Sequence, residues 1–197
     1  MNTLKAEKRS MDVKAKKLRR EGFVTGNLFG REIEGSIPLK FTKKEIEVLL
    51  KNNNKGSQVM LELDGKTYDA LIKEVDYNPL AHTVEEVDFQ ALVSNEMVHS
   101  VAEIILENEE KVMSGVLQDE LKEVAYKALP ADLVDKIKVD VAGMKIGDTL
   151  RVKDLEIAKN KNIHITTDPE AVVATVTPVH NVVPETETEA EETAEEK

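Results

Sequence analysis

The stretch SQVMLELDGKTYDALIKEVDY, residues 57–77, carries the local signal that most restricts how this chain can fold. Two strand-type runs flank Asp64-Gly65, and Asp-Gly is among the dipeptides that most favour a two-residue β-hairpin turn. Aromatic residues make up only 4% of the chain and Trp is absent, while Val, Ile and Leu are plentiful. An aliphatic, largely β-branched core is typical of packed sheets. The sequence therefore predicts a mainly β protein that contains this hairpin.

Further strand-type runs occur in both halves of the chain, with short helices between them. In the first half they cover residues 2–10, 23–41 and 82–93; Gly22 precedes the second run and three glycines interrupt it, as at bends and close backbone approaches. A short helix is expected over 14–21 and a longer one over 42–53, where Thr42 and Glu45 form a capping box. The second half has strand-type runs at 96–129, 137–141 and 170–179, a helical turn started by Pro130, and a tight turn at 145–148.

The pattern restarts after Ser94-Asn95, which predicts two mainly β domains, residues 1–94 and 95–183. Residues 184–197, PETETEAEETAEEK, hold seven Glu, one Lys and no large hydrophobic residue. Such a segment buries too little apolar surface to offset the entropy lost on ordering. We expect it to be a disordered acidic tail.

Several functional classes are disfavoured by composition. The chain has no Cys, which removes disulfides, thiolate metal sites and a Cys nucleophile, and this is typical of a reducing, cytoplasmic location. It shows neither a signal-peptide pattern nor a run of eighteen apolar residues. The four His have no metal-ligand spacing, and no phosphate-loop or nucleophile motif is present. We expect no catalytic site, metal, cofactor, small-molecule substrate or membrane partner.

Charge is distributed unevenly. The net charge is −11, yet residues 1–20 hold eight cations against Glu7 and Asp12. The segment VKAKKLRREGF, residues 13–23, has no acidic residue before Glu21, so its helix lacks the i,i+4 Glu–Lys pairs that usually support an exposed helix. One interpretation is a solvated charged face. The other is a phosphate-binding surface, because an anion would relieve the repulsion among these side chains.

These residues also resemble a known family. The order of a basic strand, KKLRREG, a strand ending LFG, the capped helix, the DGK hairpin, DYNP and VDFQAL resembles the N-terminal domain of bacterial ribosomal protein L-twenty-five. The segment LPADLVDKIKVDVAGMKIGDTLRVKDL resembles the C-terminal domain of its longer members, called Ctc or general stress protein Ctc. The resemblance covers about residues 3–180.

The resemblance implies an N-terminal β-barrel that binds 5S rRNA around loop E in the central protuberance of the large ribosomal subunit. It implies a structural constituent of the ribosome without enzymatic activity, with 5S rRNA and neighbouring large-subunit proteins as partners. Carried over residue by residue, the family's RNA contacts are Arg9, Lys14, Lys16, Lys17, Arg19, Arg20, Phe29 and Asp88. The acidic second domain is expected to contact proteins rather than RNA.

Three departures from the family pattern support an alternative. Asp12-Val13-Lys14-Ala15 stands where Gly-Lys-Gly is common, Thr25-Gly26 replaces Pro-Ala, and Glu86 replaces the His of an HVDF-like motif. An anion at this last position would repel phosphate. The alternative is a divergent, non-ribosomal paralogue that acts as a stress-related protein-interaction factor.

Overall fold

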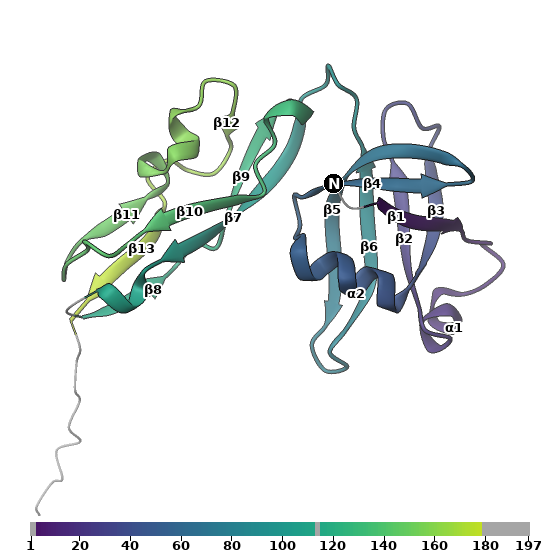
Figure 1. Ribbon diagram of the computed structural model, residues 1–197, viewed down its shortest axis with the longest axis horizontal. Helices are drawn as coiled ribbons and strands as arrows, with labels where there is room; N and C mark the ends of the chain where they lie inside the picture. Colours follow the sequence, from purple (N-terminus) through teal and green to yellow (C-terminus); the bar gives the residue numbers. More distant parts are fainter. Residues whose placement is uncertain (1–2, 113–114, 179–197) are drawn as a thin grey trace, which may run out of the picture.

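The computed structural model describes residues 3–112 and 115–178. They form two β units, and residues 92–97 connect one to the other (Figure 1). The mainly β fold class is confirmed. The predicted tail, residues 184–197, lies outside the described residues.

The first unit is a closed six-stranded barrel with the strand order β1-β3-β2-β6-β5-β4. Its strands are β1 (Thr3–Lys8), β2 (Phe23–Phe29), β3 (Ser36–Thr42), β4 (Gln58–Leu63), β5 (Lys66–Asn78) and β6 (Thr83–Ala91). Two seams are parallel, β1 with β4 and β2 with β6, and the other four are antiparallel. Closure removes the open strand edges that would otherwise invite aggregation.

Alternation along these strands builds the barrel core. In β4, Val59, Leu61 and Leu63 are buried while the residues between them are half-buried. The aromatic rings of Phe41 and Phe89 meet in the interior, with their centroids 5.4 Å apart. The core is otherwise aliphatic, as the composition predicts.

The local turn and cap signals are confirmed. Asp64 and Gly65 have φ values of 51° and 77°, the left-handed pair that a type I′ hairpin turn requires, and they connect β4 to β5. Helix α2 (Lys43–Asn52) begins at Thr42, whose side chain and that of Glu45 form the reciprocal capping box. Helix α1 (Ala15–Arg20) lies between β1 and β2.

The second unit has two sheets, with the strand orders β10-β7-β9-β12 and β11-β13-β8. The strands are β7 (Val98–Glu107), β8 (Val116–Asp119), β9 (Glu123–Ala128), β10 (Lys136–Asp140), β11 (Thr149–Arg151), β12 (His164–Ile165) and β13 (Val172–Thr177). The expected turn at Pro130 is a short 3-10 helix, Pro130–Asp132. Tyr126 is buried in this unit. Its hydroxyl accepts from the Val134 amide at 2.8 Å and donates to the Val134 carbonyl at 2.9 Å.

Candidate nucleic-acid interface

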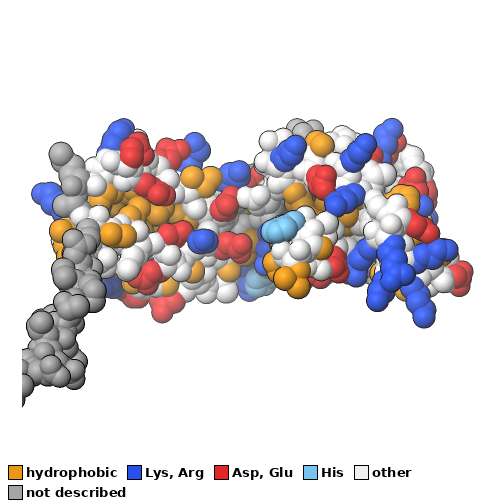
Figure 2. All heavy atoms as spheres, turned by 90° about the horizontal axis from the view of Figure 1, so that it is seen from below, with side chains coloured by type: hydrophobic (Ala, Val, Ile, Leu, Met, Phe, Trp, Pro, Cys, Tyr) orange, Lys and Arg blue, Asp and Glu red, His pale blue; other side chains and the backbone are white. Residues whose placement is uncertain are grey.

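Helix α1 presents a cluster of exposed cations at the barrel surface. Leu18 is only 7% exposed and fixes the helix against β2, and most of the basic side chains around it face outward. Four of the predicted contact residues are exposed: Lys14, Lys16, Lys17 and Arg20. Figure 2 shows Lys and Arg side chains gathered at the end of the barrel where α1 lies. We call these four residues the α1 cations.

Arg19 belongs to the same helix but has a different environment. Its guanidinium lies 3.1 Å from a carboxylate oxygen of Glu85 and 3.2 Å from one of Glu86, and its Nε donates to the Glu85 carbonyl at 3.1 Å. The Arg19 side chain is only 31% exposed. Lys17 also lies 3.8 Å from Glu21 in an i,i+4 pair, so the expectation that this helix lacks such pairs is wrong. The repulsion expected among the cations of the helix is therefore partly relieved by Glu21, Glu85 and Glu86. Through its contacts with Glu85 and Glu86, Arg19 holds α1 against β6.

Arg9 is half-buried at the end of β1. Its amide donates to the Pro38 carbonyl at 2.9 Å, and its Nη2 donates to the Val13 carbonyl at 3.1 Å. Its Nε is buried without a hydrogen-bond partner among the described residues. Arg9 therefore closes the turn that leads into α1, and a phosphate can reach it only over a limited surface.

Asp88 and Phe29 lie on the same outer face of the barrel. Val87 and Phe89 point into the core, so Asp88 between them points outward, and Phe29 follows the buried Leu28 in the same way. Asp88 accepts from the Asn27 amide at 2.9 Å and from the Asn27 side-chain nitrogen at 3.1 Å. Asn27 and Phe29 are two residues apart on β2, so amide, carboxylate and aromatic ring share one face.

An acidic hollow adjoins this row on β5 and β6. It is lined by Glu74, Asp76, Glu86 and Asp88, which face each other as the register pairs Glu74 with Asp88 and Asp76 with Glu86. Burial raises the pKa of Glu86, and the neighbouring Asp88 raises it further, against the opposing effect of Arg19. Four carboxylates grouped in this way make this part of the surface unfavourable for an anion, although Arg19 offsets the charge of Glu86.

The structure brings some of the predicted residues together and separates others. Phe29 and Asp88 lie along the parallel β2–β6 seam, whereas the α1 cations lie near the other end of β2, where Arg19 connects the helix to Glu86. Arg19 and Arg9 are engaged within the protein. Sequence reasoning missed Asn27 and Glu85. Asn27 could have been found because alternate residues of a strand share one face, and Asn27 lies two residues before Phe29. Nothing in the neighbouring sequence points to Glu85.

No helix in the described ranges is long and apolar enough to cross a membrane. Within the same part of the chain, no group of His, Cys, Asp or Glu is arranged to hold a metal ion.

A closed barrel with cations grouped on one face has the construction of a nucleic-acid-binding protein. Comparison with known proteins agrees with this class. Residues 4–89 match the Ribosomal L25p family, and residues 97–180 match the family "Ribosomal protein TL5, C-terminal domain".

Full-length relatives share both units. The chain is 32% identical over 190 residues to "Large ribosomal subunit protein bL25" of Carboxydothermus hydrogenoformans, which covers 92% of this chain and 94% of the relative. Proteins of the same name from Bacillus velezensis and Caldanaerobacter subterraneus are 31% and 30% identical; the matches cover 90% and 98% of this chain, and 89% and 98% of those relatives. The chain belongs to the bL25 family, in its two-domain form.

Proposed function

We propose that this protein binds 5S rRNA through the α1 face of its barrel. Membership of the bL25 family makes the chain a structural constituent of the large ribosomal subunit, and neighbouring subunit components are its partners. The observation that carries the RNA proposal is that the exposed α1 cations adjoin Arg19, whose partner Glu86 accepts from Asn27, and Asn27 in turn donates to Asp88. The protein acts in the cytoplasm, with the ribosomes, and no catalytic step is assigned to it.

The two parts of this face have different chemistry. Lys and Arg on a short, fixed helix supply attraction to phosphates but read no sequence. Asp88 and Asn27 offer an acceptor and an amide to 2′-hydroxyl groups and base edges, which the shallow minor groove of A-form RNA exposes. Phe29 adds an aromatic surface at the end of the row. Backbone attraction and selective contacts are therefore adjacent.

Glu86 does not present an uncompensated anion to this surface. Its carboxylate is paired with Arg19, and its raised pKa reflects a partly buried position. Glu86, one of the departures that support the alternative of a non-ribosomal paralogue, thus has a structural role on the barrel. No observation favours that alternative, and a stress-related role stays a prediction.

The direct test is a filter-binding titration of the full chain with a 5S rRNA fragment that contains loop E. An RNA duplex of equal length and unrelated sequence is titrated in parallel at several salt concentrations. We expect the 5S fragment to bind at least tenfold more tightly. Asp88→Asn, which keeps the shape but changes the acceptor pattern, should reduce this preference, and equal affinity of the wild-type chain for both RNAs would refute the proposal.

A further inference from the structure

The sheet of the second unit carries a row of cationic and titratable side chains where it meets the barrel. His99 on β7 pairs with Lys127 on β9, and Lys127 pairs with His164 on β12. Val98 and Ser100 are buried, so His99 and its register partners lie on the outer side of the sheet. Because adjacent strands are about 4.8 Å apart, a row across three strands spans roughly 10 Å.

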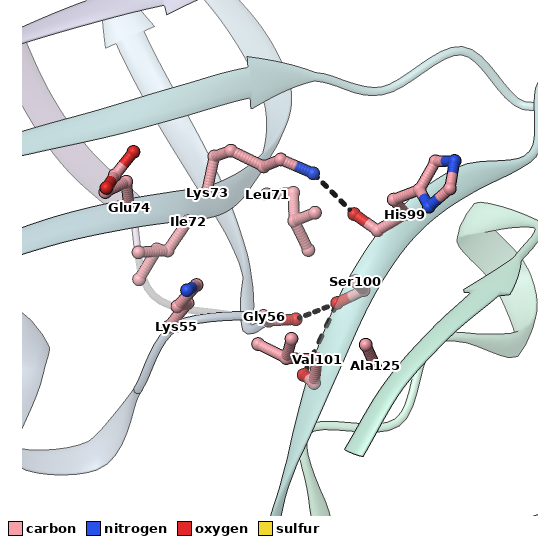
Figure 3. Close-up of a pocket in the computed structure, with 10 residues that line it drawn as sticks. All are labelled: Lys55, Gly56, Leu71, Ile72, Lys73, Glu74, His99, Ser100, Val101 and Ala125. Atoms are coloured by element: carbon pink, nitrogen blue, oxygen red, sulfur yellow. Dashed lines mark hydrogen bonds between the residues drawn. The ribbon is translucent and has the colours of Figure 1, made fainter. Parts of the chain in front are cut away.

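The barrel contributes two more cations to the same place. Lys73 on β5 donates from Nζ to the His99 carbonyl at 2.8 Å, and Lys55 precedes the turn whose Gly56 carbonyl accepts from Ser100 Oγ at 3.3 Å. Figure 3 shows Lys73 reaching across to β7 and Lys55 entering from the barrel turn. A hollow of about 250 Å³ lies between the units at this point. We call Lys55, Lys73, His99, Lys127 and His164 the junction cluster.

These cations lack internal compensation. Over residues 3–112 and 115–178, none of Lys55, Lys73 and Lys127 is in an ion pair, unlike Arg19. Glu74 also lines the hollow. Burial and the nearby Lys55 lower the pKa of Lys73, and burial, Lys127 and Lys73 lower the pKa of His99.

The location of the junction cluster is unexpected for the charge of this half of the chain. Residues 95–197 carry 11 Lys or Arg against 23 Asp or Glu, yet His99, Lys127 and His164 form one row near the barrel; the acid nearest this row on β7 that contacts the barrel turn is Glu103, which accepts from the Asn54 side chain. An anion bound there would relieve the repulsion among neighbouring cations, as phosphates do on basic protein surfaces. Helix α1 lies on the side of the barrel away from the second unit, so the barrel separates the α1 cations from the junction cluster (Figure 1).

We infer that the junction cluster binds the phosphodiester backbone of a second RNA segment, distinct from the one that contacts α1. The inference rests on the proposed function, since a protein held among ribosomal RNA segments meets phosphates on more than one side. It assigns part of the second unit an RNA contact, where its overall charge alone suggests protein contacts. An acidic protein surface is the competing ligand, and the experiment separates the two.

The test uses the full isotope-labelled chain and an RNA duplex of about 16 base pairs, a length that a compact RNA-binding domain spans. NMR follows the His99 and His164 imidazoles and, separately, the backbone amides of α1. Both sets of signals should shift on titration. Lys55→Gln/Lys127→Gln should weaken the imidazole response at least tenfold and leave the α1 response unchanged, whereas Lys159→Gln/Lys161→Gln, which removes the same charge from exposed positions of the second unit, should change neither.

Each alternative outcome has a defined meaning. If the α1 amides shift but the imidazoles do not, the junction inference fails and the proposed function stands. If the α1 amides do not respond, the proposed function fails. If a poly-glutamate peptide of equal charge shifts the imidazoles as strongly as the RNA does, the junction recognises acidic protein, and the inference is overturned.

Discussion

Gly26 is the position where a single methyl group would test both the barrel and its functional face. It lies in β2 at the parallel seam with β6, and an ideal Cβ built there would be 2.1 Å from the Val87 carbonyl oxygen and 3.2 Å from the Phe41 ring. Real Cβ atoms essentially never come within 3.0 Å of such a neighbour, so the strands must separate by about 1 Å in a close-packed interior.

We expect Gly26→Ala to destabilise the barrel by about 2 to 3 kcal/mol, the upper range for overpacking in a core. For a unit of this size the loss corresponds to a fall of about 10 to 20 °C in the barrel's Tm. Differential scanning calorimetry measures it. The matched control is Gly143→Ala, where nothing lies within 4 Å of the added Cβ and the change should stay within about 0.5 kcal/mol.

The same substitution should also disturb the candidate interface, because Asn27 and Asp88 meet across the strained seam. Amide shifts should therefore concentrate on β2 and β6, and selectivity for the 5S fragment should fall even where the variant is folded. A variant with the wild-type barrel Tm and unshifted β6 amides would show that β2 and β6 do not pack backbone to backbone here.

Three further substitutions test individual contacts. Glu86 has a folded-state pKa above its ordinary value, so the protein loses stability as pH rises from that ordinary value through the raised pKa, and the loss then stays constant. Glu86→Gln should therefore gain stability relative to wild type at neutral pH and lose that advantage in acid, as urea unfolding at several pH values will show. Arg19→Gln removes two half-exposed ion pairs and a backbone contact, and should cost about 1 kcal/mol while lowering the RNA salt slope less than removal of an α1 cation; a slope loss equal to that of Lys16→Gln would contradict its structural role. Tyr126→Phe leaves the partly buried amide and carbonyl of Val134 without the hydroxyl partner that each has in the folded protein, and should cost about 1 to 2 kcal/mol in chemical unfolding of the second unit. An unchanged midpoint would refute this.

Features encoded by neighbouring residues were predictable from the sequence. The Asp64-Gly65 turn needs only two residues with positive φ, and the α2 cap needs only Thr42 and Glu45. The outward position of Phe29 also follows from strand alternation. In each case the physical cause acts within a few residues.

Features that depend on strand pairing between distant segments were not predictable in this way. Arg19 and Glu86 are 67 residues apart, and only the β2–β6 register brings them within 3.2 Å. The same holds for the row of His99, Lys127 and His164, whose members are too scattered in sequence to form a motif. The local sequence shows that residues 13–20 contain no acid. It does not show that Glu85 and Glu86, on a distant strand, pair with Arg19.

The salt dependence of 5S rRNA binding tests the central claim most directly. The variant Lys14→Gln/Lys16→Gln/Lys17→Gln/Arg20→Gln removes the α1 cations and leaves Arg19 in place. Its control, Lys5→Gln/Lys44→Gln/Lys51→Gln/Lys66→Gln, removes the same charge from exposed positions elsewhere on the barrel. At about 0.7 to 0.9 per phosphate contact, the slope of log K against log salt should fall by about 3 in the first variant and stay unchanged in the control. A first variant that keeps the full slope, or a control that loses as much, would contradict phosphate binding by α1.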